Sequence, residues 1–249
     1  SLDYKLILPD AKFTGYGYNL TNEALLRNWY ITLSPIYNKQ WKNYSNLNLN
    51  DNSIQAAAYK LKINAPDGIT VQSNLKKNKS ENGVNYFSSK SNREVLVYFT
   101  QDNPFQLLKI NNDRTLLTNI FRESEDQDKS IDKAKRIDDF VTKAFDFKGE
   151  NKFLIPVLVY DNNPFFGLND LPKFLAPFNE SFLEEISFLK SYLHFYLSNN
   201  LSIDLRQDHW IIGGLQTYLM IKYIETYYPK EKYLGRLGDF KLMKAYTLA

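Results

Sequence analysis

The sequence contains no cysteine and only two histidines. Without cysteine the chain has no disulfide, no thiol nucleophile and no cysteine-ligated metal. Long apolar runs are also lacking: an uncharged stretch such as Trp210 to Ile221 has about a dozen residues, against the roughly 20 that span a membrane. Nor does charge of one sign dominate, because 31 basic and 28 acidic residues leave a net charge of +3, which gives no strong case for nucleic-acid binding.

Aromatic side chains, by contrast, are plentiful. The chain has 17 Phe, 18 Tyr and 3 Trp, and 43% of its residues are hydrophobic. Such a composition is typical of a globular protein and excludes a disordered chain, which could not bury so much apolar surface. The length of 249 residues is sufficient for two domains.

Alternating polar and apolar residues predict that the first part of the chain is a β structure. The pattern covers residues 4–8, 58–63, 69–72, 84–87 and 94–100, with a Pro-Asp-Gly turn signal at 66–68. The stretch 76–80 is interpreted as a solvated, charged turn. We therefore expect an antiparallel, sandwich-like β domain over residues 1–112.

Helical periodicity then predicts a mostly helical domain over residues 113–249. Apolar residues recur at three- and four-residue steps in 131–145, 182–197 and 206–227, and one buried strand is expected at 153–160. Together these parts give an α+β fold. Residues 237–249 resemble an amphipathic helix without a stop signal, so we expect the sequence to be a fragment of a longer protein.

One segment resembles a known family. Residues 208–219, Asp-His-Trp-Ile-Ile-Gly-Gly-Leu-Gln-Thr-Tyr-Leu, are similar to the WLNEG-(F/L)-A-x-Y-L segment of aminopeptidase N-like gluzincin metallopeptidases. In that family the Glu of NEG is the third zinc ligand, nineteen residues after the last His of HExxH. The equivalent position here is Gly213, and nineteen residues earlier stands His194. The resemblance implies a thermolysin-like helical domain.

The zinc motif, however, is degenerate. An intact HExxH places two His on one helix face to bind Zn²⁺, and its Glu activates the metal-bound water. Here the window reads Lys190, Ser191, Tyr192, Leu193 and His194. The family ligands and base are thus replaced at Lys190, Ser191 and Gly213, and only His194 remains. We expect no catalytic residue, no bound zinc and no other cofactor.

The substrate-binding strand GxMEN of the family would correspond to residues 153–169. An ungapped alignment places Asn163 to Gly167 there and lacks the Glu that holds the amino terminus of the substrate. A gap could bring Gly167 and Asn169 into that position. Phe165, Phe166, Gly167 and Asn169 are therefore the candidate peptide-binding residues, with buried packing as the alternative for the two Phe.

Other sites were considered on the same helices. His194 and His209 could bind a metal with Asp208 or Glu184, although their spacing does not require it. A Ser191–His194 pair lacks a nucleophile elbow and an evident Asp partner. The neighbouring Glu184 and Glu185 point to different helix faces and are interpreted as acidic residues that favour the start of the helix.

The sequence thus predicts a catalytically inactive peptidase homologue that acts as a binding or structural module for a peptide or protein. The alternatives are an active zinc metallopeptidase with an unusual or externally completed ligand set, and an unrelated β-plus-helical binding protein. The glycine pair Gly213-Gly214, which costs about 1 kcal/mol per residue in a helix, indicates close packing or a vacated functional position. Family habit and the absence of an initial Met suggest a location outside the cytoplasm.

Overall fold

A computed structural model shows that the chain folds into two compact units, each built from several segments. The first unit comprises Ser1–Glu125, Gly149–Val159 and Asn199–His209, and the second comprises Asp126–Lys148, Tyr160–Ser198 and Trp210–Ala249. The residues that the structure describes are 2–12, 14–19, 22–37, 39–42, 54–102, 105–110, 114–120, 127–145, 151–159, 164, 178–201 and 203–231.

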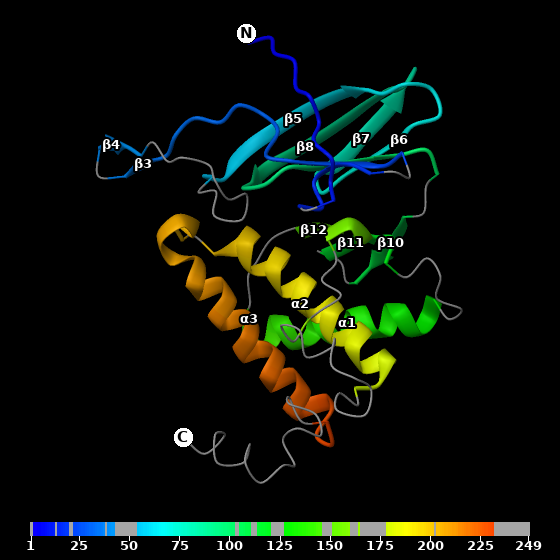
Figure 1. Cartoon of the computed structure of the whole chain (residues 1–249), viewed down its shortest axis with the longest axis vertical. Helices are drawn as coiled ribbons and strands as arrows, with labels where there is room; N and C mark the ends of the chain where they lie inside the picture. Colours follow the sequence, from blue (N-terminus) through cyan, green and yellow to red (C-terminus); the bar gives the residue numbers. More distant parts are fainter. Residues whose placement is uncertain are drawn as a thin grey trace. The chain divides into compact units, whose positions relative to one another are not determined.

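The first unit is built of short strands, most of them antiparallel (Figure 1). A four-stranded sheet has the order β1-β2-β9-β6, a three-stranded sheet has the order β5-β8-β7, and β3 and β4 form a separate pair. The strands are β1 (Gly17–Tyr18), β2 (Ala24–Arg27), β3 (Ile36–Tyr37), β4 (Gln40–Trp41), β5 (Ala57–Asn64), β6 (Thr70–Ser73), β7 (Lys76–Glu81), β8 (Val84–Asn92) and β9 (Leu96–Thr100).

The core of this unit lies on one face of the three-stranded sheet. Along β5 the side chains alternate between half-buried and exposed, as expected for a strand with one covered face. Phe87 of β8 is buried on the covered face, and Val71 of β6 and Val97 of β9 join the same cluster. The remaining buried members of the cluster are Ala65, Leu75 and Val95.

A second three-stranded sheet, β10-β11-β12, contains a parallel pair. β10 (Gln106–Lys109) is antiparallel to β11 (Arg114–Thr118), which is parallel to β12 (Asn151–Ile155). Parallel neighbours need a long connection, and here the chain passes through helix α1 between them. Because β11 and β12 are parallel, the β structure is not purely antiparallel as expected. Strands β10 and β11 were not predicted.

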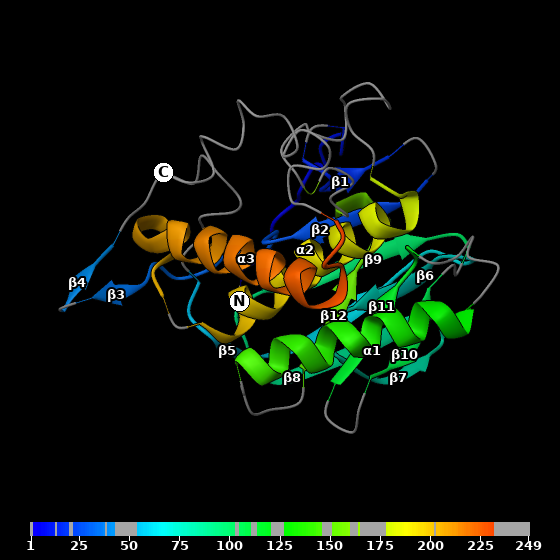
Figure 2. The ribbon, with the colours of Figure 1, turned by 90° about the horizontal axis from the view of Figure 1, so that it is seen from below.

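The second unit contains three helices, close to the ranges predicted: α1 (Gln127–Ala144), α2 (Glu180–Asn200) and α3 (Leu205–Tyr227). Figure 2 shows α2 next to both of the others. Most of its residues from Phe182 to Leu197 are buried, including Leu189 and Tyr196. Asn179 caps α2, because its side-chain oxygen accepts a hydrogen bond from the Ser181 N–H at 2.9 Å.

Helix α3 begins with a similar cap and then bends. The Asp204 carboxylate accepts a hydrogen bond from the Arg206 N–H at 3.0 Å. At Asp208 the backbone leaves helical geometry, with φ −114° and ψ 18°, so the long regular part of the helix starts after this residue. The helical prediction for 206–227 is confirmed, but its first turn is separate.

Three local expectations were wrong or only partly right. Residues 4–8 form no strand, and Ile7 is 84% exposed. Residues 76–80, expected as a turn, belong to strand β7, whose side chains are all exposed, so no alternation marks the strand. The strand expected at 153–160 ends at Ile155, because Pro156 lacks an N–H to continue the ladder, and a short 3₁₀ turn follows at Val157–Val159.

The mixed α+β class is confirmed by these sheets and helices. Among the described residues, no helix is both long enough and apolar enough to cross a membrane. The helix expected at 237–249 lies outside the described residues.

Candidate functional site

Helices α2 and α3 form an antiparallel pair, and their contacts set its register. Gln216 of α3 donates from its side-chain amide to the backbone carbonyl oxygen of Lys190 on α2 at 2.6 Å. Further along α3, Tyr223 donates to Glu185, and beyond the helix the Tyr228 ring meets that of Phe182. Later residues of α3 therefore contact earlier residues of α2, as in any antiparallel helix pair.

The same register brings the motif positions of the two helices to one level. Gly213 stands one turn before Gln216, and His194 one turn after Lys190, so the antiparallel contact at Gln216 and Lys190 places Gly213 opposite the turn of His194. Lys190 and His194 are half-buried, four residues apart on one face of α2, and Ser191 is buried. These four positions thus occupy adjoining turns of two packed helices.

Among the described residues, the glycine pair does not serve close helix packing. A Cβ atom added at Gly213 would meet none of their atoms within 4 Å beyond the backbone of its own helix, and the same holds for Gly214. The expectation that these glycines allow a close approach is wrong for the packing described. The other interpretation, a position that once carried a side chain, stays a prediction.

No set of metal ligands gathers around His194 in the part of the chain that the structure describes. Among those residues, no group of three or more His, Cys, Asp or Glu side chains could hold a metal ion. His209 is exposed in the first turn of α3. Glu184 lies ten residues before His194, about 15 Å away along the helix axis. Within the described residues, His194 and His209 therefore form no metal site with Asp208 or Glu184.

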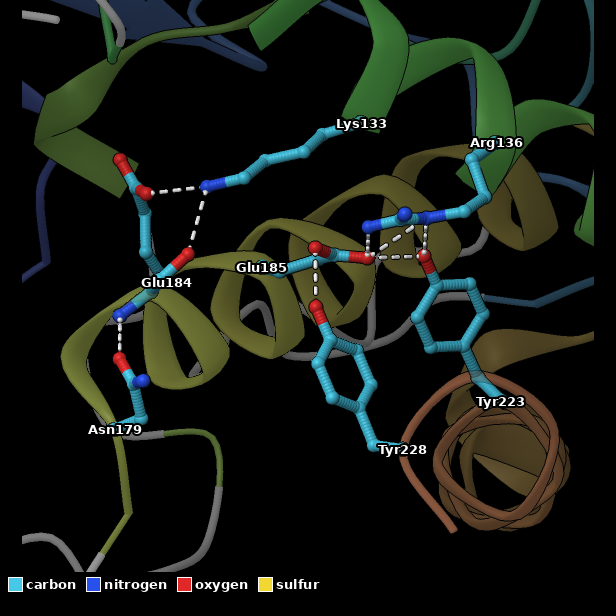
Figure 3. A network of polar contacts seen from close by, with 8 residues as sticks. Lys133, Arg136, Asn179, Glu184, Glu185, Tyr223 and Tyr228 are labelled. Atoms are coloured by element: carbon cyan, nitrogen blue, oxygen red, sulfur yellow. Dashed lines mark hydrogen bonds and ion pairs between the residues drawn. The ribbon is translucent and has the colours of Figure 1, made fainter. Parts of the chain in front are cut away.

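Glu185, in contrast, is a buried carboxylate at the centre of a polar network (Figure 3). Its side chain forms an ion pair with Arg136 of α1, whose Nε donates to Glu185 Oε1 at 3.1 Å. The hydroxyls of Tyr223 and Tyr228 also donate to it, the latter to Oε2 at 2.5 Å. Glu184, on the next face, is 43% exposed and pairs with Lys133 at 2.8 Å.

The network changes the proton affinity of its members. Burial, aided by the hydrogen bond to the Glu185 carboxylate, raises the pKa of Tyr223 and of Tyr228 above their usual value. Burial alone would lower the pKa of Arg136, but its hydrogen bonds to Glu185 and Tyr223 outweigh that effect and raise it. At neutral pH both tyrosine hydroxyls are therefore protonated and donate hydrogen bonds to the carboxylate.

Sequence reasoning missed this network, although one signal was present. Glu185 follows Phe182 by three residues and precedes Leu189 by four, so it lies on the apolar face of α2. A carboxylate at such a position requires partners, because an unpaired buried charge is costly. The prediction that Glu184 and Glu185 point to different faces is confirmed, but Glu185 does more than favour the start of the helix.

A second buried polar contact supports the same helix pair from the side of α1. Asp138 is fully buried and accepts a hydrogen bond from the Tyr192 hydroxyl at 2.5 Å. Tyr192 stands one residue after Ser191 and stacks on Tyr196, whose hydroxyl donates to the Phe145 carbonyl oxygen at 2.7 Å. The turns around the motif positions of α2 are therefore held from the opposite side by α1.

The candidate peptide-binding residues Phe165, Phe166, Gly167 and Asn169 lie outside the described residues. Their role stays a prediction. In comparisons with known proteins, no family model matches the chain, and no curated protein matches it.

Proposed function

We propose that the protein is a catalytically inactive homologue of the aminopeptidase N-like gluzincins, in which the helix frame of the zinc site serves as a binding or structural module for a peptide or protein. The observation that carries the proposal is the antiparallel α2–α3 pair, in which Gly213 stands opposite the turn of His194. A third zinc ligand would have to reach across from this level of α3.

The residue types at these positions support loss of catalysis. A Lys ammonium at position 190 would oppose a bound dication, and Ser191 offers no carboxylate to accept a proton from the metal-bound water. Gly213 has no side chain to act as a ligand. A thermolysin-like fold for residues 113–249, a domain boundary at 112/113 and a peptide-binding role for Phe165, Phe166, Gly167 and Asn169 form part of the same proposal.

Assays of aminopeptidase activity with added zinc test the proposal. We expect no hydrolysis of amino-acid amides or short peptides above a blank, and no effect of a chelator. His194→Ala should leave this baseline unchanged and at most lower the melting temperature. A zinc-dependent rate that a chelator removes and His194→Ala abolishes would instead establish an active metallopeptidase with an unusual ligand set.

A further inference from the structure

The outer face of the β5-β8-β7 sheet carries a regular array of lysines. Residues paired across the sheet form two rows. One row contains Lys60, Ser88 and Lys76. The other contains Lys62, Tyr86 and Lys79. Each row has a lysine at both ends and a smaller or aromatic side chain on the central strand.

The pleat places both rows on one face. Lys60 and Lys62 alternate with the half-buried Leu61 of β5, so they point away from the core. A register shift between Lys77 and Lys79 keeps Lys76 and Lys79 on the same outer side. With strands about 4.8 Å apart and alternate residues about 7 Å apart, the four backbone positions mark a rectangle of about 10 Å by about 7 Å.

Little negative charge balances this face. Among the residues of β5, β7 and β8, the only acidic one is Glu81. Its carboxylate lies 2.8 Å from the ammonium of Lys79, which also stands 4.9 Å from the centre of the Tyr86 ring. All four lysines are exposed. The face therefore carries an excess of positive charge, while the chain as a whole is almost balanced.

We propose that this lysine face, formed by Lys60, Lys62, Lys76 and Lys79, docks on the surface of a bilayer that contains anionic lipid. The face is one side of a three-stranded sheet, and four exposed ammonium groups spread over it complement a surface of singly charged head groups. The three strands carry no Arg, the residue whose planar fork suits paired contacts with individual phosphates in nucleic acid. The inference does not depend on the proposed function, since it concerns the other unit.

Vesicle co-sedimentation of the full chain tests the proposal. Vesicles of phosphatidylcholine with phosphatidylglycerol should bind the protein at about 0.1 M salt and release it near 1 M, where the Debye length falls from about 10 to about 3 Å. Vesicles of phosphatidylcholine alone should not bind it. The variant Lys60→Gln/Lys62→Gln/Lys76→Gln/Lys79→Gln should bind several hundredfold more weakly, at about fivefold for each lysine removed.

A matched variant separates the lysine face from net charge. Lys5→Gln/Lys12→Gln/Lys135→Gln/Lys143→Gln removes the same charge from exposed lysines elsewhere and should still bind. Circular dichroism checks that both variants fold, and the pairs Lys60→Gln/Lys62→Gln and Lys76→Gln/Lys79→Gln replace the fourfold variant if it does not.

Several results would overturn the proposal. These are equal loss in both variants, absence of vesicle binding by the unchanged protein, and binding to DNA or heparin without binding to vesicles. Self-association of the lysine-face variant with unchanged vesicle binding would also count against it. In that case the lysines would protect the edge strands β5 and β7 from pairing with other chains.

Discussion

The replacement Glu185→Gln tests whether the buried network holds the three helices together. It keeps the shape of the side chain and removes its charge. Arg136, whose side chain is 39% exposed, loses its ion pair but keeps some contact with water. The Tyr228 hydroxyl, which donates to Oε2 at 2.5 Å, would face an amide nitrogen that is itself a donor unless the amide turns over. If the amide turns over, its nitrogen faces Arg136, which can only donate, so one contact of the network is lost in either orientation.

The expected loss of stability follows from these contacts. Hydrogen bonds to a charged group contribute about 1.5–3 kcal/mol each, and breaking a buried ion pair costs about 3–5 kcal/mol. Partial exposure of Arg136 reduces that figure, so we expect the free energy of unfolding to fall by about 2–3 kcal/mol. For a chain of this size, that corresponds to a drop in melting temperature of about 5–10 °C.

The adjacent residue provides the matched control. Glu184→Gln makes the same chemical change one position away, where the carboxylate is 43% exposed and pairs with Lys133. Exposed pairs contribute about 0–1 kcal/mol, so this variant should melt close to the unchanged protein. Urea unfolding followed by circular dichroism at the helical band compares the two. A loss for Glu185→Gln within about 0.5 kcal/mol of that for Glu184→Gln would refute the reasoning, since experimental extrapolation is good to about 10–15%.

Three further predictions concern other features of the structure. Burial and Glu185 raise the pKa of Tyr223 above 10.0, so the unfolded state loses this phenol proton first, and the free energy of unfolding should be full below pH 10 and fall above it. Tyr223→Phe should make the alkaline fall of the urea midpoint less steep, and an unchanged slope would contradict this. Burial and the nearby Lys77 lower the pKa of Lys152 to about 8, so between pH 8 and the ordinary lysine pKa of 10.5 the unfolded state binds more protons and the free energy of unfolding should rise with pH. Thermal melts of Lys152→Met should lose that rise, and retention of the rise would contradict the burial argument. Gly213→Ala and Gly214→Ala should each raise the free energy of unfolding by up to about 1 kcal/mol, because the added methyl meets open space; a loss in urea unfolding would show that these glycines are packed.

The helices were predictable because long periodic patterns specify them. Each of the segments 131–145, 182–197 and 206–227 repeats apolar residues over several turns, and each forms a helix with boundaries within a few residues of the expectation. The strands with one covered face, such as β5, were predictable for the same reason. Strand β7 was not, because all of its side chains are exposed and pairing with β8 alone makes it a strand.

The network around Glu185 depends on contacts that no local pattern specifies. The carboxylate and the Tyr223 hydroxyl are 38 residues apart in the chain, and Arg136 comes from a third helix, 49 residues away. A carboxylate on an apolar helix face indicates that partners are needed but not which ones. Similarly, the resemblance made His194 and Gly213 two ligand positions of one site, but the register that brings their turns together comes from the contacts of Gln216, Tyr223 and Tyr228 with α2.

Zinc content after equilibration with excess metal and removal of free ion tests the central claim most directly, when measured on two forms of the chain. The unchanged protein should retain no stoichiometric zinc. The variant Lys190→His/Gly213→Glu supplies the two ligand types that the family has at these positions, and a Cβ at position 213 meets no described atom within 4 Å beyond its own helix backbone, so the proposal predicts one zinc ion per chain. Stoichiometric zinc in the unchanged protein, or a folded variant that binds none, would contradict the account of a dismantled gluzincin site.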